Sequence, residues 1–135
     1  MEESMKKIEG GVTAAKGFFA AATAAQIKYK DRMDMAMLYS ENPCVAAGTF
    51  TTNVVKAAPV LWDQKIVSQS DHAQAIVINA GIANACTGKE GMEYCKRTAE
   101  KAAEVLGILS ESVFVASTGV IGNQLPPGSK RWGIN

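Results

Sequence analysis

A serine, a threonine and a glycine follow one another as Ser117, Thr118 and Gly119, directly after the apolar run VFVA at residues 113–116. The run predicts a β-strand, and the small residues after it predict a turn. A turn at an exposed strand end leaves backbone N–H groups unpaired beside a short hydroxyl side chain. Such donors suit an anionic oxygen, although an ordinary strand-to-turn junction has the same pattern.

A second stretch of small residues, NAGIANACTG at residues 79–88, also follows an apolar strand, predicted over residues 73–79. It leads into a predicted helix, and helix N-termini often bind anions. The stretch lacks both glycine-rich nucleotide-binding patterns, G-x-G-x-x-G and G-x-x-x-x-G-K-[ST], so a nucleotide site is not supported. Asn79 and Asn84 are candidates for ligand donors, and equally for residues that cap turns.

Side chains that attack substrates are scarce. A catalytic triad would have to combine Ser117 with His72, the single histidine, and no G-x-S-x-G elbow surrounds any serine. Cys86 precedes the predicted helix, where the helix dipole lowers the pKa of a thiol; the alternative is a small buried residue in a turn. Cys95 falls on the apolar helix face and is predicted to lie in the core.

The composition limits the classes of protein that remain. A chain of 135 residues with 47% hydrophobic and 20% charged residues fits one globular domain. Its net charge of +1 gives no indication of nucleic acid or an anionic membrane, and no apolar run is long enough to span one. The polar start MEESMKKIEGG resembles neither a secretory signal nor a mitochondrial presequence. Three cysteines predict free thiols in a reducing, cytoplasmic setting, and one histidine makes a zinc site improbable.

Apolar periodicity predicts the elements that would hold these turns. Residues 89–106 repeat apolar side chains at three and four residues, which predicts a one-sided helix ending at Gly107. Glycines, threonines and phenylalanines favour extended structure over residues 12–26 despite the many alanines. Two strands, 33–40 and 44–51, are predicted to form a hairpin through the turn at 41–43. Thr52 and Asn53 are predicted to cap a helix whose first turn is 54–58, with Pro59 opposing its continuation, and residues 60–67 fit helix or strand.

Four segments carry a further signal when they are read together. They are GVTAAKGF (11–18), FTTN before AAPV (50–60), NAGIANACTG (79–88) and VASTGVIG before QLP (115–126). In this order they resemble the signatures of the glutamate N-acetyltransferase/ornithine acetyltransferase family. The resemblance covers residues 11 to about 126, with Ile82 standing where the family often has asparagine.

The resemblance implies an α/β fold, a mixed sheet with packed helices, as part of a four-layer α-β-β-α sandwich of the N-terminal-nucleophile acetyltransferase type. Family members cleave themselves before a threonine, which becomes the first residue of a β chain. Its hydroxyl moves acetyl from N-acetylornithine to glutamate for arginine synthesis, and some members also use acetyl-CoA. The threonine's own amine can act as the base, which agrees with the absence of a convincing triad. The family's oxyanion hole falls on Thr118 and Gly119, and neither a metal nor a cofactor is implied.

The chain departs from the family after Pro126. No threonine in the family's Ala-Thr context is present, so no nucleophile is expected in this chain. We expect a charged lead-in over residues 1–10, a truncated α-chain-like domain over 11–126 and an atypical tail over 127–135. The predicted function is the α-chain portion of a cytoplasmic acetyltransferase that a separate β chain completes, inactive when isolated. The alternatives are an inactive or partner-binding fragment and a hydrolase of the same architecture.

Overall fold

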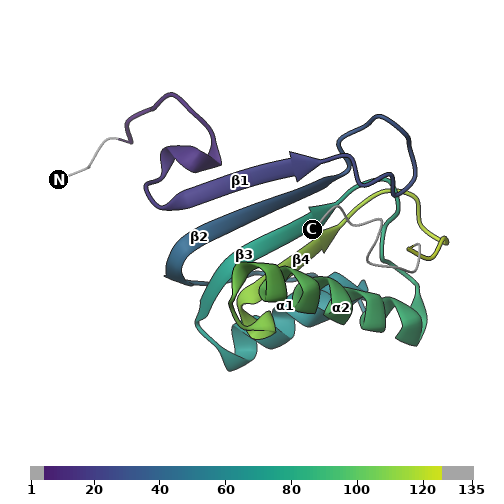
Figure 1. Ribbon diagram of the computed structural model, residues 1–135. Helices are drawn as coiled ribbons and strands as arrows, with labels where there is room; N and C mark the ends of the chain where they lie inside the picture. Colours follow the sequence, from purple (N-terminus) through teal and green to yellow (C-terminus); the bar gives the residue numbers. More distant parts are fainter. Residues whose placement is uncertain (1–4, 126–135) are drawn as a thin grey trace.

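The protein is described by a computed structural model over residues 5–125, and its framework is one mixed β-sheet (Figure 1). The strand order is β1-β2-β3-β4, antiparallel except for the parallel pair β3–β4. The predicted lead-in is described from residue 5 onward, and the predicted tail lies outside the described residues. The strands are β1 (Phe18–Thr23), β2 (Met35–Val45), β3 (His72–Asn79) and β4 (Val113–Ser117). The helices are α1 (Ala58–Gln69) and α2 (Gly88–Leu106), with short 3-10 turns η1 (Val12–Ala14) and η2 (Ser110–Ser112).

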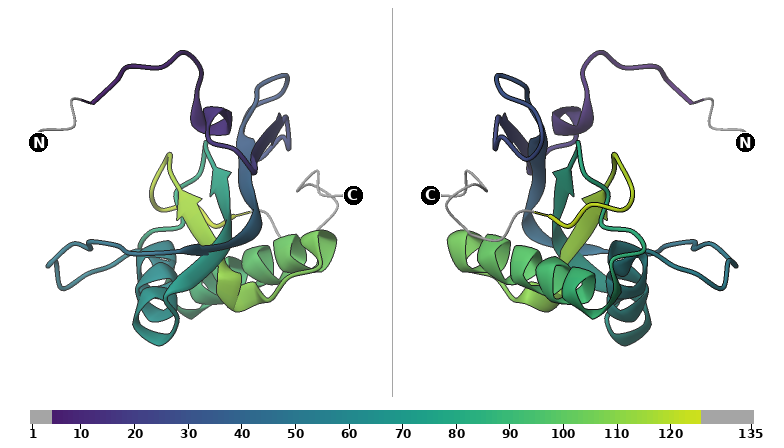
Figure 2. Two further views of the ribbon diagram at one scale, coloured as in Figure 1. Left: turned by 90° about the vertical axis from the view of Figure 1, so that its left-hand side faces the viewer. Right: turned by 90° about the vertical axis from the view of Figure 1, so that its right-hand side faces the viewer.

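Both helices lie on the same side of the sheet (Figure 2). On β3, burial alternates along the strand, so that Ala75 and Val77 face the helices while Ile76 faces the other way. The apolar side of α2 packs against this face with small residues, including Cys95 and Ala99, which are almost completely buried. Small side chains allow the helix to approach the strands closely. The prediction of a one-sided helix over 89–106 that ends at Gly107, a left-handed cap, is confirmed.

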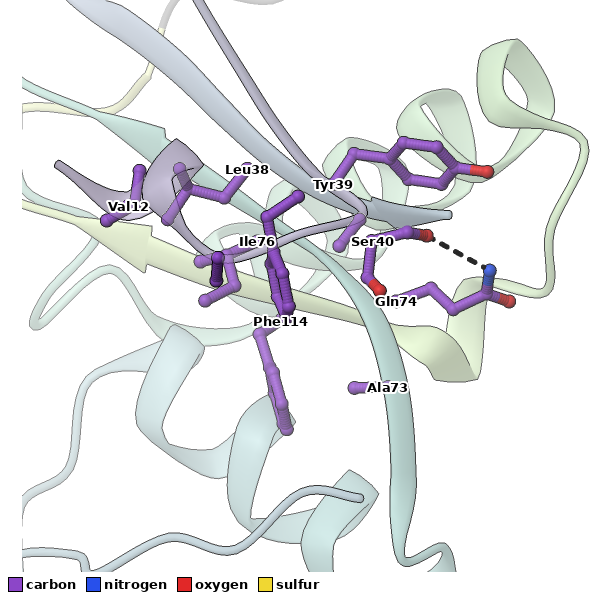
Figure 3. A pocket seen from close by; sticks show the side chains of 11 residues that line it. Val12, Leu38, Tyr39, Ser40, Ala73, Gln74, Ile76 and Phe114 are labelled. Carbon is purple, nitrogen blue, oxygen red and sulfur yellow. Dashed lines mark hydrogen bonds between the residues drawn. The ribbon is translucent and has the colours of Figure 1, made fainter. Parts of the chain in front are cut away.

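The opposite face of the sheet is apolar and has no helix over it within residues 5–125 (Figure 2). A pocket of about 310 Å³ lies on this face. In Figure 3, Leu38 of β2 and Ile76 of β3 lie together with Val12 of η1, Phe114 of β4 lies below them, and the Tyr39 ring points away. The lining residues are Val12, Ala15, Phe18, Leu38, Tyr39, Ser40, Ala73, Gln74, Ala75, Ile76 and Phe114. None of these lining residues has a charged side chain.

The predicted hairpin between residues 33–40 and 44–51 is wrong. The chain continues as the single strand β2 through Pro43 to Val45, and residues 46–57 form neither helix nor strand. A register shift between Tyr39 and Cys44 absorbs the proline. The last β2 residue that pairs with β1 is Ser40, so Pro43 removes no hydrogen bond on that side.

The predicted helix start at Thr52 and Asn53 is also wrong. Helix α1 begins at Ala58, and Pro59 lies in its first turn. A proline is favourable there because the first N–H groups of a helix have no partner within it. The segment 60–67, which fitted either structure, is therefore helical. The extended structure predicted over 12–26 is confirmed for β1 and replaced by a 3-10 turn at Val12–Ala14.

Candidate functional site

The two stretches of small residues lie side by side at one end of the sheet. Strands β3 and β4 run in parallel and end at the paired residues Asn79 and Ser117 (Figure 1). The loops beyond them stay connected: Thr118 N–H donates to the Asn79 carbonyl at 3.0 Å, and Val120 N–H donates to the Gly81 carbonyl at 3.1 Å. We call residues 79–87 and 117–122 together the strand-end site.

Gly119 has to be a glycine because the two loops touch there. Its φ is +131°, a conformation that side chains rarely adopt. A β-carbon on Gly119 would also lie 2.3 Å from the carbonyl carbon of Gly81 and 2.7 Å from the nitrogen of Ile82. Any larger residue would therefore push the two loops apart, whatever its effect on a ligand.

Ser117 is a structural residue of the site. Its hydroxyl oxygen accepts the Asn84 N–H at 2.9 Å, and the hydroxyl donates to the Ile82 carbonyl at 3.2 Å. Both bonds cross from β4 to the loop after β3. The serine hydroxyl is thus used to hold the loops together.

Asn79 and Asn84 hold turns, which decides between the two interpretations of these residues. Both side chains are buried. Asn79 Nδ2 donates to the Ile82 carbonyl and Asn84 Nδ2 to the Gly91 carbonyl, each at 2.8 Å. Asn84 Oδ1 also accepts the Thr87 hydroxyl at 2.5 Å, so its side chain joins the loop to the first turn of α2.

Two donors of the turn have no hydrogen-bond partner among residues 5–125, the Thr118 hydroxyl and the Gly119 N–H. The prediction of unpaired N–H groups is therefore right for Gly119 and wrong for Thr118, whose N–H is bonded to Asn79. Both residues are exposed. One hydroxyl and one adjacent N–H can receive a negatively charged oxygen.

The other candidate nucleophiles do not assemble into a site. His72 begins β3, whereas Ser117 ends β4 at the opposite end of the paired strands, about 20 Å away, so a Ser117–His72 pair is excluded. Cys86 is exposed, so its interpretation as a buried residue is wrong. Cys95 is buried as predicted, and burial raises the pKa of its thiol to about 12. Among residues 5–125, no three His, Cys, Asp or Glu side chains gather as a metal site.

Sequence reasoning missed the buried carboxylate of Asp34. Its two oxygens accept the N–H groups of Ala25 and Ile27, each at 2.7 Å, and thereby fix the loop between β1 and β2. That loop supports the site, because a β-carbon on Gly81 would lie 3.2 Å from the β-carbon of Lys28. An acid at the start of an otherwise apolar strand was the available signal.

Sequence reasoning also missed Trp62 and Asp63, adjacent residues of α1. Trp62 Nε1–H donates to the Val113 carbonyl, and Asp63 Oδ1 accepts the Val115 N–H, both at 2.9 Å. Burial raises the pKa of the Asp63 carboxyl to about 6, against the opposing effect of the Val115 N–H. The mixed periodicity of residues 60–67 concealed both roles.

The profile of the ArgJ family matches residues 19–135. The chain belongs to the ArgJ family. Arginine biosynthesis bifunctional protein ArgJ of Gloeobacter violaceus is 53% identical over 119 residues, which are 88% of this chain and 29% of that protein. The protein of the same name from Thermotoga neapolitana is 52% identical over 120 residues, 88% of this chain and 30% of that protein. The chain thus spans about 30% of the length of these curated relatives.

Solved structures agree with the fold. The crystal structure of ArgJ from Bacillus halodurans superposes with a TM-score of 0.86 at 39% identity, covering 93% of this chain and 65% of that chain. Ornithine acetyltransferase from Mycobacterium tuberculosis, complexed with ornithine, gives a TM-score of 0.84 at 43% identity, covering 92% and 66%. The family resemblance read from the four motifs and the mixed α/β fold are confirmed. Within residues 5–125, no helix is long and apolar enough to cross a membrane.

Proposed function

We propose that this chain is the α-chain portion of an acetyltransferase that moves acetyl from N-acetylornithine to glutamate in arginine biosynthesis. The chain supplies the oxyanion hole from Thr118 and Gly119, and a threonine at the start of a separate β chain is the nucleophile. The observation that carries the proposal is the pair of unpartnered donors on the turn after β4, in a chain of the ArgJ family.

The chemistry follows from where charge develops. Attack of a hydroxyl on the acetyl carbonyl puts negative charge on the carbonyl oxygen. Donors that are already fixed at that position stabilise the charge more than they stabilise the neutral carbonyl. The bond of the Ser117 hydroxyl to the Ile82 carbonyl and the bond of the Thr118 N–H to the Asn79 carbonyl hold the turn in place before substrate arrives, so little reorganisation is needed during the reaction.

In this proposal, the rest of the assembly supplies the parts of the enzyme that this chain lacks. We propose that a second sheet covers the apolar face opposite the helices, which would complete a four-layer α-β-β-α sandwich. The exposed Phe18 and the partly buried Leu38 and Ile76 would become interior residues of that sandwich. Acetyl-CoA is a second possible acetyl donor for the same site.

Reconstitution tests the proposal. The chain is co-expressed with the part of the Gloeobacter violaceus relative that follows its matched region, and ornithine release from N-acetylornithine is measured with and without glutamate. We expect glutamate-dependent release from the pair and none from this chain alone. Steady acetyl transfer by the purified chain alone would contradict the proposal.

A second candidate is a binding or scaffolding α-like chain without activity, and the apolar sheet face that residues 5–125 leave without an α-helix favours it. The same experiment separates the two. A stable complex without acetyl transfer supports the scaffold, whereas a complex with peptide cleavage in place of acetyl transfer supports a hydrolase of the same architecture.

A further inference from the structure

Within residues 5–125, strand β4 lies at the edge of the sheet and pairs with β3 alone. An edge strand presents N–H and C=O groups that no further strand takes up. The backbone N–H and C=O groups of β4 that point away from β3 therefore need other partners. Those partners determine how firmly β4 is held in its place beside β3. This matters because the strand ends in the Ser117, Thr118 and Gly119 turn.

Helix α1 takes up outward groups of β4 with side chains. Trp62 donates from Nε1 to the Val113 carbonyl, and Asp63 accepts from the Val115 N–H, each at 2.9 Å. Two adjacent helix residues thus bind two alternate strand residues on the same side of the strand. A strand repeats every two residues, about 6.6 Å, so together the bonds fix the position of β4 along its own axis as well as its distance from α1.

The nature of the acceptor is informative. Asp63 is half-buried, and a carboxylate in such surroundings is less stable than it is in water. Val115 offers it one N–H, β4 contributes no titratable side chain, and α2 contributes the buried thiol of Cys95, whose pKa the Asp63 charge raises further. An asparagine oxygen would accept the same N–H without placing a charge there. Because the acceptor is a carboxylate, the hydrogen bond that holds β4 depends on the charge of Asp63.

The part of β4 that α1 holds runs directly into the strand-end site. Val115 is three residues before Thr118, and the segment between them is strand without a bulge. Beyond it, the Thr118 N–H is bonded to Asn79, and Ser117 is bonded to the loop after β3. A shift of β4 along β3 would move the Thr118 hydroxyl and the Gly119 N–H relative to that loop.

We propose that Trp62 and Asp63 are positioning residues, which set the place of the Thr118–Gly119 donors by holding the outer edge of β4. The effect on acetyl transfer rests on the proposed function, whereas the positioning itself is a property of this chain and can be tested without substrate. The side chains touch neither Thr118 nor Gly119 through any hydrogen bond described for residues 5–125, so they act through the strand.

Nuclear magnetic resonance of the chain labelled with ¹³C and ¹⁵N tests the positioning. We expect the amide signals of Val115, Thr118 and Gly119 to titrate together with the Asp63 carboxyl carbon, with a midpoint near the pKa of about 6. The variant Asp63→Asn should abolish this titration and keep the fold. His72, the single histidine, lies at the far end of β3, so His72→Gln is the control that should preserve it. A role confined to stability would lower the unfolding temperature without this signature.

A second variant tests the tryptophan. Trp62→Phe keeps an aromatic ring and removes the donor, and we expect amide exchange of Val115 to become about tenfold faster, with Leu61→Ala as a neighbouring control. The proposal is overturned if Val115 titrates while Thr118 and Gly119 do not, or if their titration persists in Asp63→Asn. If an Asp63 variant fails to fold, the wild-type titration decides alone. Turn amides that respond as expected, in an assembly where Thr118→Ala is silent, would support positioning and reject the proposed function.

Discussion

The two faces of the sheet differ in how far the rest of residues 5–125 covers them. On the helix side, Val77 is 1% exposed and the neighbouring polar groups are paired, so this chain completes its own packing. On the other side, Ile76 and Phe114 line an open pocket, and residues 5–125 place no α-helix over this face of the sheet. Strand β3 thus has one row of side chains in the buried core and the other row on the open face. A domain can therefore hold its strand-end turn in place while one whole face of its sheet stays open.

The largest effect on stability should come from placing a lysine at one or the other of two adjacent residues of β3. Val77→Lys buries an ammonium group among α2 side chains, and we expect the loss of about 4 kcal/mol or more of unfolding free energy, enough to prevent folding. Ile76→Lys places the same charge on the open face and should leave the fold of the isolated chain intact. Circular dichroism with thermal unfolding measures both. Equal damage from the two variants would mean that the faces do not differ.

The next effect separates the two hydroxyls of the turn in a reconstituted assembly. Thr118→Ala removes a free donor, so we expect kcat to fall about 10²–10³-fold, with substrate binding and unfolding temperature nearly unchanged. Ser117→Ala instead leaves the Asn84 N–H unpaired, and we expect a loss of about 1–3 kcal/mol in stability. Steady-state kinetics and thermal unfolding are measured on each variant. A silent Thr118→Ala beside an inactive but stable Ser117→Ala would reverse the two assignments.

Asp63, on the helix side of the sheet, should make the free energy of unfolding depend on pH. Its pKa is raised from 3.8 in an unfolded chain to about 6 in the fold, so the protonated form is favoured by folding. The stabilisation is fully present below pH 4 and is lost as the pH rises through 6. Relative to Asp63→Asn, the wild type should lose about 1–2 kcal/mol between pH 4 and pH 7, after allowance for partial exposure. Denaturant unfolding across this range measures it, with Glu93→Gln, an exposed acid of α2, as the control.

The smallest effect concerns the rates at which thiols react. Cys86 is exposed and Cys44 partly so, while Cys95 is 1% exposed with a pKa raised to about 12 by burial first and by the Asp63 charge second. We expect Cys86 and then Cys44 to react with a disulfide reagent in the native chain, and Cys95 only on unfolding. Titration in denaturant without reductant should find three thiols. A Cys44–Cys86 disulfide would contradict the free thiols predicted from the sequence.

Periodicity along single elements predicted much of the fold. Burial alternates on β3 and repeats by helical turns on α2, and both elements appeared where these patterns placed them. The boundaries near Pro43 and Pro59 were wrong because the effect of a proline depends on which neighbours its missing N–H would have met. That information lies in the pairing of β1 with β2 and in the first turn of α1, which a linear pattern does not contain.

The candidate site was predicted in part for a similar reason. The turn residues Thr118 and Gly119 stood out by type, and their roles remain a prediction. The sequence left Asn84 equally open as a ligand donor or a turn cap, and its hydrogen bonds to the Gly91 carbonyl and the Thr87 hydroxyl decide for the turn. Asp63 accepts an N–H from a residue 52 positions away, and nothing in its local sequence distinguishes it from a surface acid. Its role became visible only when α1 and β4 were seen next to each other.

The parallel pairing of β3 with β4 has a consequence for the order of folding. Strands β1 and β2 are joined by one loop, which the Asp34 carboxylate closes locally. Strand β4 can meet β3 only after α2 has crossed the sheet, because parallel neighbours need a long connection. Contacts that close such long connections form late. We therefore expect pulsed hydrogen exchange during refolding to protect the amides of β1 and β2 before that of Val115, so that the donor turn is assembled in the last step.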